Sequence, residues 1–231
     1  MNNLEPEEDS AMERTICVTG KGVISVKPDL IRLMLTLEDT YDTYEKTLEH
    51  STEQVEMLKD CFEKLGFQRG DLKTLTFNVN TEYESYQDYK KAWKKRFMGY
   101  KFVHNMKLEF DADNKRLGEV LYSLAHLSIS PEFCINYTIK DPETAKNQLL
   151  GKAVVDSKEK AKVLTAAAGV TLGEVINIDY SWGEIKFQSE PMDRCMSLAE
   201  NCRIASGSYD IDIEPDDIEV TDTVTVVWRI E

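Results

Sequence analysis

Apolar residues recur along this chain with two periods, one typical of helices and one typical of strands. The stretch from Tyr44 to Leu65 has the clearest helical period, because apolar or small residues follow one another at intervals of three and four. Its stripe consists of Tyr44, Leu48, Ser51, Val55, Leu58, Phe62 and Leu65. Gly66 follows where a helix commonly ends in a left-handed residue. We therefore predict an amphipathic helix with Leu58 in the core.

A second stripe predicts the longest helix, which begins after Asp141 and ends at Gly169. Asp is favoured as an N-cap, and Pro142 occupies the first helical position, where proline is tolerated. The residues that we expect to face the core are Leu150, Val154, Ser157, Ala161, Leu164 and Ala168. A shorter helix is predicted for residues 114–127, with Leu117, Val120, Leu121 and Leu124 pointing inward.

Strand-like alternation fills most of the remaining chain. It begins at Ile16, and Gly20-Lys21-Gly22 interrupts it, which indicates a bulge or a tight bend. Pro28-Asp29 then breaks the run, so we predict two strands joined by a short turn that Asp29 closes by bonding its own backbone. Further strands are predicted for residues 72–86, 99–110, 133–140, 175–188 and 218–231. The stretch 86–97 reads as a hairpin tip or a short helix.

The predicted order is therefore β-β-α-β-β-α-β-α-β-β, with two β-β-α units in succession. Because hairpins dominate, we expect an α+β fold with a mostly antiparallel sheet and three helices on one face. Residues 1–13 are rich in acidic side chains and are predicted to be a disordered acidic tail. Residues 14–231 are predicted to form one domain, with a long irregular loop at 189–216.

Composition narrows the partners and the compartment. A chain of 231 residues can bury a core without disulfides or metals. Its net charge of −14 argues against nucleic acid as the main partner, since phosphate binding needs clustered Lys and Arg. No stretch approaches the roughly 20 apolar residues of a membrane span. The first 13 residues lack the basic and apolar regions of a secretory signal, so we expect a cytoplasmic protein.

The five cysteines are an odd number without a short CxxC pair, which favours free thiols in a reducing compartment. Cys17, Cys61 and Cys134 fall within predicted strands or helices, where cysteine usually packs as a small hydrophobe. Cys195 and Cys202 share the predicted loop and could meet, so a redox pair there stays open. We expect all five to be thiols.

A basic segment from Tyr86 to Lys101 is the most unusual feature of the chain. It carries six basic residues against one acidic residue, Asp88, and aromatic residues interleave with the charges. The candidate interaction residues are Lys90, Lys91, Trp93, Lys94, Lys95 and Arg96. Tryptophan beside arginine and tyrosine is the composition of an interface anchor. Three readings remain open: self-association through the acidic surface of another copy, a solvated hairpin tip, and another anionic partner such as a membrane surface.

Other candidate chemistry is weaker. Gly20-Lys21-Gly22 lacks the spacing of a phosphate-binding loop. The histidines His50, His104 and His126 show neither an i, i+4 pair nor an HExxH motif. Asp29 has no evident partner acid or base. We therefore predict no catalytic residue, no metal site and no cofactor, although distant residues could still converge in the fold.

Several segments together resemble the SIMPL-domain family. They are the opening V-T-G-K-G-V-I-S-V-K-P-D (18–29), the L-K-T-L-T-F-N-V stretch, G-Y-K-F-V-H-N (99–105), A-A-G-V-T-L-G-E-V, and the closing I-E-P-D-D-I-E-V-T-D-T-V-T-V. The resemblance covers about residues 15–230. The resemblance implies that the relatives of this chain include bacterial proteins described as periplasmic immunogenic or oxidative-stress-defence proteins. Many of these relatives carry a secretory signal. Much of the family has no assigned function.

From the residues and the resemblance together we expect a non-enzymatic protein that acts as a homo-oligomeric assembly or scaffold module. The resemblance alone adds an expected link to stress tolerance. The alternative is a small-molecule or peptide-binding protein that uses a cleft between sheet and helices. An enzyme comes third.

Overall fold

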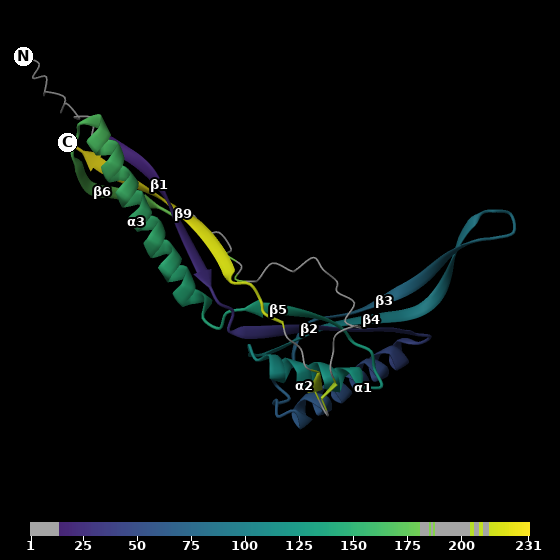
Figure 1. Cartoon of the computed structure of the whole chain (residues 1–231). Coiled ribbons are helices and arrows are strands. Elements are labelled where there is room, and N and C mark those ends of the chain that lie inside the picture. Colours follow the sequence, from purple (N-terminus) through teal and green to yellow (C-terminus); the bar gives the residue numbers. More distant parts are fainter. Residues whose placement is uncertain (1–13, 181–184, 186, 188–203, 206–207, 210–212) are drawn as a thin grey trace, which may run out of the picture. The chain divides into compact units, whose positions relative to one another are not determined.

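The computed structural model describes residues 14–180, 185, 187, 204–205, 208–209 and 213–231 (Figure 1). The predicted acidic tail and most of the predicted loop lie outside these residues. The contacts divide the chain into two compact units. Unit 1 comprises Met1–Val26, Asp141–Phe187 and Ile218–Glu231, and unit 2 comprises the remainder. One domain over residues 14–231 stays a prediction.

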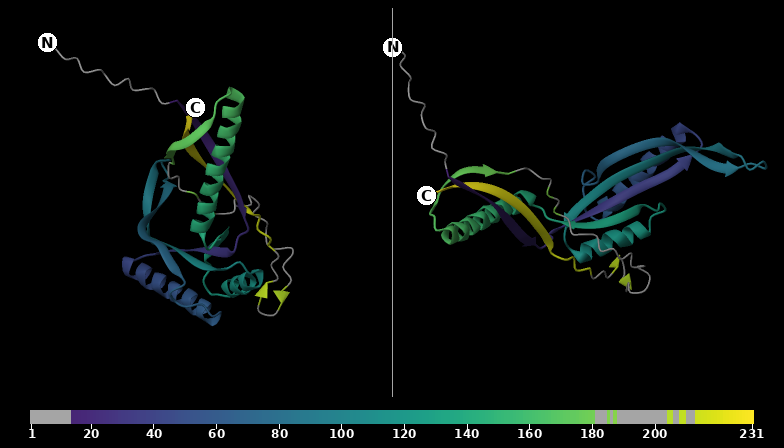
Figure 2. Two further views of the ribbon diagram at one scale, coloured as in Figure 1. Left: turned by 90° about the vertical axis from the view of Figure 1, so that its left-hand side faces the viewer. Right: turned by 90° about the horizontal axis from the view of Figure 1, so that it is seen from above.

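Unit 1 is a three-stranded antiparallel sheet covered by one long helix (Figures 1 and 2). Its strands lie in the order β1-β9-β6, with β1 at Thr15–Val26, β9 at Ile218–Ile230 and β6 at Leu172–Asp179. The helix α3, Pro142–Ala168, packs on β1 and β9 and hardly touches β6. Asp141 caps it by accepting from Thr144 N at 3.0 Å, as the sequence predicted.

The face that α3 buries differs from the predicted stripe. Its buried residues recur strictly every fourth position: Ala145, Leu149, Ala153, Ser157, Ala161 and Thr165. Ser157 and Ala161 were predicted correctly, but Leu164 is 50% exposed, and Leu150 and Val154 are only partly buried. The cause is a close approach of backbones. A methyl group on Gly20 would lie 2.0 Å from the Ala153 carbonyl oxygen, and one on Gly22 would lie 2.2 Å from that of Leu149.

Gly20 and Gly22 therefore do not mark a bulge or a bend, which corrects the sequence prediction. The ladder between β1 and β9 runs from Thr15↔Arg229 to Val26↔Ile218 without a register shift. Both glycines are buried on the face of β1 that meets α3. The missing side chains let helix and strand backbones touch, and small residues on α3 complete the fit.

The same helix covers the outer edge of β1 with polar side chains. Lys160 Nζ donates to Thr19 O at 3.4 Å, and Lys152 Nζ donates to Val23 O at 3.1 Å. Between them, Lys21 N donates to Asp156 Oδ2 at 2.7 Å. Since unpaired edge groups invite pairing with another strand, α3 blocks this edge.

Unit 2 is a four-stranded antiparallel sheet with helices on one face, in the order β3-β4-β2-β5. Its strands are β2 (Leu30–Tyr41), β3 (Lys73–Gln87), β4 (Trp93–Asp111) and β5 (Glu132–Thr138), and its helices are α1 (Tyr44–Lys64) and α2 (Asn114–Ala125). Within the predicted loop, β7 (Ile204–Ala205) and β8 (Ser208–Tyr209) pair with each other.

The core of unit 2 lies between this sheet and its helices. Leu58 and Phe62 of α1 are buried, as predicted, against Phe102 and Met106 of β4 in one cluster. The four inward residues predicted for α2 are all buried. At the start of α1 the prediction was wrong: Tyr44 and Leu48 are exposed, and Thr47 is buried instead. Thr47 is satisfied there because its hydroxyl donates to Thr43 O at 2.8 Å.

The α+β class, the antiparallel sheets and the three helices are confirmed in the described chain, and the element order matches approximately, because the short strands β7 and β8 were not predicted. However, β1 and β2 do not pair, since each belongs to a different sheet.

Asp29 also acts differently from the prediction. Its carboxylate accepts from Lys140 N at 2.7 Å, its N–H donates to Thr138 O at 3.1 Å, and its carbonyl accepts from Ala112 N at 3.1 Å. It therefore ties three chain segments together instead of closing its own turn.

Substitutions of Leu58 and Leu164 test which faces of α1 and α3 are buried. Leu58→Ala should destabilise the protein by about 2–5 kcal/mol, because it leaves a cavity in a closed core. Leu164→Ala should cost less than about 0.5 kcal/mol, as expected for an exposed site. Urea unfolding measures both, and equal losses would contradict the assigned face of α3.

The glycine contact gives the second test. Gly20→Ala should destabilise by about 1–3 kcal/mol or more, since the added methyl group meets backbone that cannot move aside. Gly151→Ala, on the exposed side of α3, should stabilise by about 0.5–1 kcal/mol, because nothing lies within 4 Å and alanine favours the helix. If thermal unfolding shows that Gly20→Ala is neutral, the close approach is wrong.

Candidate interaction surface on the β3–β4 hairpin

The basic segment forms the end of a long hairpin, one of the two predicted alternatives. Strand β2 pairs with β4 only as far as Tyr41↔Tyr100. Beyond that point β3 and β4 continue alone from Glu82↔Gly99 to Gln87↔Trp93. We call residues 82–99 the arm. Figure 1 shows it leaving the sheet of unit 2 as a two-stranded ribbon, so it has two open faces.

The arm begins at a bulge that depends on Gly99. The register shifts after Glu82↔Gly99, because the next pair is Tyr83↔Phe97 and Met98 has no opposite residue. Gly99 has a φ of +145°, and a methyl group there would lie 2.2 Å from Tyr41 O. Bulges increase the local twist of a ribbon. Gly99 therefore sets where the arm leaves the sheet.

Asp88 organises the turn at the tip. Its Oδ1 accepts from Lys90 N at 2.8 Å and Ala92 N at 3.1 Å, and its N–H donates to Ala92 O at 3.0 Å. Lys91 takes the left-handed conformation, with a φ of 58°. The Lys94 ammonium and these backbone donors hold the pKa of Asp88 below its usual range. The tip is thus a defined turn.

The structure divides the predicted cations into two groups. Lys94 pairs with Asp88 at 3.0 Å, Arg96 pairs with Glu84, and Lys101 pairs with Glu38 at 3.0 Å. Within the described chain, Lys90, Lys91 and Lys95 form no ion pair. The excess positive charge of the arm is therefore concentrated in these three lysines, which the sequence alone could not separate from the others.

Aromatic residues form a stripe on one face of the arm. Ring centroids lie 5.7 Å apart for Tyr83 and Phe97, 5.4 Å for Phe97 and Tyr100, and 5.7 Å for Tyr100 and Tyr44. Trp93 lies on the same face as Phe97, because alternate residues of a strand share a face. Trp93 is 71% exposed. The sequence placed Trp93 in the interaction set but missed the extension to Tyr44, which depends on pairing between distant segments.

His104 lies at the base of the same hairpin and is buried. Its Nε2 is 2.9 Å from Thr74 Oγ1 on β3, and its ring meets that of Phe77 edge-on at 5.0 Å. Its Nδ1 has no partner in the described structure. Burial lowers the pKa of His104, and the Lys59 ammonium on α1 lowers it further. The neutral ring is therefore the form that the fold accommodates.

The other histidines lie apart from it. His50 stacks on Tyr41 with ring centroids 4.3 Å apart and approaches Glu53 at 3.1 Å, while His126 Nδ1 is 2.7 Å from Tyr122 O. In the described part of the chain, no three His, Cys, Asp or Glu side chains form a group that could hold a metal. Cys17, Cys61 and Cys134 are free thiols, and Cys195 and Cys202 lie outside the described residues.

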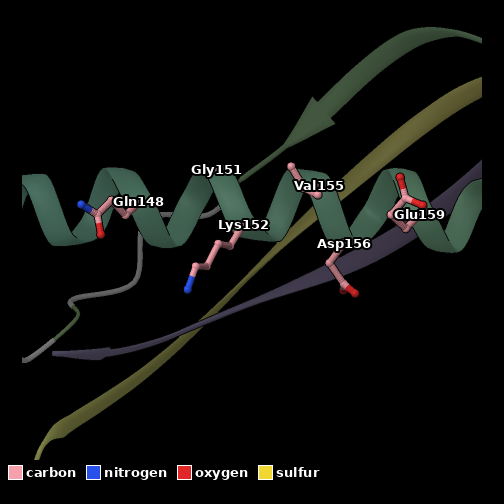
Figure 3. Close-up of a pocket in the computed structure, with 6 residues that line it drawn as sticks. All are labelled: Gln148, Gly151, Lys152, Val155, Asp156 and Glu159. Carbon is pink, nitrogen blue, oxygen red and sulfur yellow. The ribbon is translucent and has the colours of Figure 1, made fainter.

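A pocket lies along the outer side of α3 (Figure 3). Its lining comes from that helix alone: Gln148, Gly151, Lys152, Val155, Asp156 and Glu159. Two of these side chains, Lys152 and Asp156, already bond the edge of β1. The pocket is therefore a shallow surface depression, unlike the cleft between sheet and helices expected for a ligand-binding protein. None of the described helices is long and apolar enough to cross a membrane.

Comparison with known proteins agrees with the resemblance seen in the sequence. Residues 16–228 match the SIMPL family, described as "Protein of unknown function (DUF541)". Two similar relatives are each named "26 kDa periplasmic immunogenic protein". The one from Brucella melitensis is 24% identical over 216 residues, which cover 94% of this chain and 84% of the relative. The one from Brucella abortus is 23% identical over the same shares.

These relatives overturn the expectation of a cytoplasmic protein. Both are named periplasmic proteins, which points to an exported protein. The expectation rested on the composition of residues 1–13 and on the cysteine pattern. Residues 1–13 lie outside the matched residues 16–228.

The burial of His104 predicts a pH dependence of stability. Because its pKa is lower in the folded chain, the unfolded chain binds the proton more readily. Its contribution to stability is complete above the unfolded pKa, about 6.5, and is lost as the pH falls through the folded pKa. Urea unfolding at several pH values should show a smaller loss between pH 7 and 5 for His104→Leu than for the parent. Equal losses would contradict this assignment.

Proposed function

The chain belongs to the SIMPL family, whose description assigns no function, and we propose that it acts as a non-enzymatic, homo-oligomeric assembly protein. The arm is the contact element. Its partner is another copy of the same chain. The observation that carries the proposal is a two-stranded ribbon whose cations and aromatic rings are held in place but are not used by its own core.

The burial of the arm supports a role outside the fold. Every residue of β3 from Asn80 to Gln87 is exposed, and so is β4 from Trp93 to Met98. A ribbon of this kind contributes little hydrophobic stabilisation to its own unit. Trp93, Tyr83 and Phe97 together give it the apolar surface of an interface anchor.

Charge supports a second copy as the partner. The whole chain carries −14, while Lys90, Lys91 and Lys95 form an unpaired positive group. Another copy therefore offers an acidic surface at the same concentration as the arm itself. Complementary charges speed and orient such an encounter, and salt screens them over about 10 Å at 0.1 M and about 3 Å at 1 M.

The alternative, a binding protein with a cleft between sheet and helices, has less support. In unit 2 that space holds Leu58, Phe62, Phe102 and Met106, all at most 2% exposed. Closely packed side chains of this kind leave no room for a ligand without rearrangement. The periplasmic names of the relatives support an assembly that works outside the cytoplasm. A link to stress tolerance stays a prediction from the resemblance.

The test reverses the three unpaired charges. The triple variant Lys90→Glu, Lys91→Glu, Lys95→Glu should lose the assembly and reach the 26.5 kDa mass of one chain in light scattering. Its stability in urea should stay near that of the parent. The matched control is Lys27→Glu, Lys64→Glu, Lys115→Glu, which makes the same charge change at exposed sites outside the arm and should keep the assembly.

Trp93→Ala separates the apolar part of the contact. It should weaken association at both low and high salt, because it removes apolar area and no charge. A triple variant that keeps the parent's mass, or a parent that is monomeric throughout, rules out assembly through the arm. Binding of the parent to anionic vesicles, lost in the triple variant, would assign the arm to a lipid surface instead.

A further inference from the structure

Among the described residues of unit 1, strand β6 carries an exposed apolar surface. Val175 pairs with Trp228 and Ile178 pairs with Val226, so both lie on the face of the sheet that α3 covers farther along. Trp228 and Val226 are buried, but Val175 is 43% exposed and Ile178 is 51% exposed. The reason is that α3 packs on β1 and β9 and hardly reaches β6. Together with Ile176, 42% exposed at a register shift, these residues form what we call the β6 shelf.

The backbone edge of β6 is poorly suited to adding another strand. Its ladder with β9 shifts register between Leu172 and Val175 and again between Val175 and Asn177. Such irregularities twist an edge away from regular pairing. A partner would therefore meet the side chains of β6 before its backbone. This differs from β1, where side chains of α3 occupy the edge groups.

Two acidic residues flank the shelf. Glu174 precedes Val175, and Asp179 follows Ile178 opposite Thr225, on the other face of the sheet. Both are exposed, and among the described residues neither forms an ion pair. Strand β6 thus carries Val175 and Ile178 on one face, Asp179 on the other face, and Glu174 at a register shift beside Val175. Carboxylates beside apolar side chains at one sheet edge complement the arm, where unpaired lysines lie beside aromatic rings.

We propose that the β6 shelf of one copy receives the arm of a second copy. Trp93 and Phe97 would cover Val175 and Ile178, and the long side chains of the unpaired lysines would extend past the open edge of β6 toward the two carboxylates. The paired part of the arm fits within the length of β6: at about 3.3 Å per residue the arm pairs over about 17 Å and β6 extends about 23 Å. The proposal rests on the proposed function, since it names the surface on which the arm docks.

Docking of the arm on the shelf joins two different surfaces of the same chain. Each copy then offers one arm and one shelf, so the contact is heterologous. A heterologous contact can be tested by exchanging charges between its two halves, because reversing both halves restores the attraction that reversing either one destroys. An isologous contact between two arms would not respond to β6.

The experiment compares three charge variants by light scattering. Lys90→Glu, Lys91→Glu, Lys95→Glu should dissociate, and Glu174→Lys, Asp179→Lys should also dissociate. All five changes in one chain should restore the parent's molar mass. The control Glu49→Lys, Glu132→Lys, at exposed acids elsewhere, should keep the assembly. Circular dichroism and urea unfolding check that each variant is folded.

The outcomes separate the two proposals. If the triple lysine variant of the arm keeps the parent's molar mass, the proposed function fails. The β6 shelf then has no arm to bind. If the arm variant dissociates but the β6 variant does not, the arm works and the shelf assignment is overturned. If the variant with all five changes stays dissociated, the docking of the arm on the β6 shelf is also overturned.

Ile178→Ser tests the apolar part of the contact. It should weaken association, while Val163→Ser, on the outer side of α3, should not.

Discussion

The direct contact between the backbones of α3 and β1 determines how unit 1 is built. Two glycines on the strand and a row of small residues on the helix allow an approach that any larger side chain would prevent. Because the helix lies so close to β1, its lysines and Asp156 reach the edge of that strand. The same position leaves β6 beyond its cover. One constraint therefore closes one edge of the sheet and exposes an apolar strand at the other.

The arm shows how a charged segment can have a fixed conformation and still expose its charges for binding a partner. Cross-strand ion pairs neutralise Arg96 and Lys94, and Asp88 fixes the turn by accepting from two backbone N–H groups. Exposed pairs of this kind contribute little stability, and the antiparallel ladder between β3 and β4 sets the register of the ribbon. The remaining lysines lie at the tip and on the aromatic face. The arm therefore presents a fixed pattern of charge and rings without the support of a third strand.

The sequence predicted most of the elements and fewer of their contacts. The stripe of α1 ending in Phe62 is broad and apolar, so period alone identified its buried face. On α3 the apolar residues pointed to the wrong face, because a helix that touches backbone buries Ala and Ser and leaves Leu164 outside. The hairpin tip was among the predictions, but pairing of Lys94 with Asp88 needs cross-strand geometry. The partners of Asp29 could not be predicted, since Lys140 and Ala112 lie far away in the chain.

Unit 1 also has a consequence for the order of events during synthesis. Its first strand pairs with its last, and Thr19 bonds Thr225 across 206 residues of chain. At about 5–20 residues per second, β1 leaves the ribosome about 10–40 s before its partner exists. The sheet of unit 2, in contrast, comes from one continuous stretch between Lys27 and Lys140. A nascent chain must therefore keep β1 from pairing wrongly during that interval, and a chaperone that holds extended segments would act most usefully on Thr15–Val26.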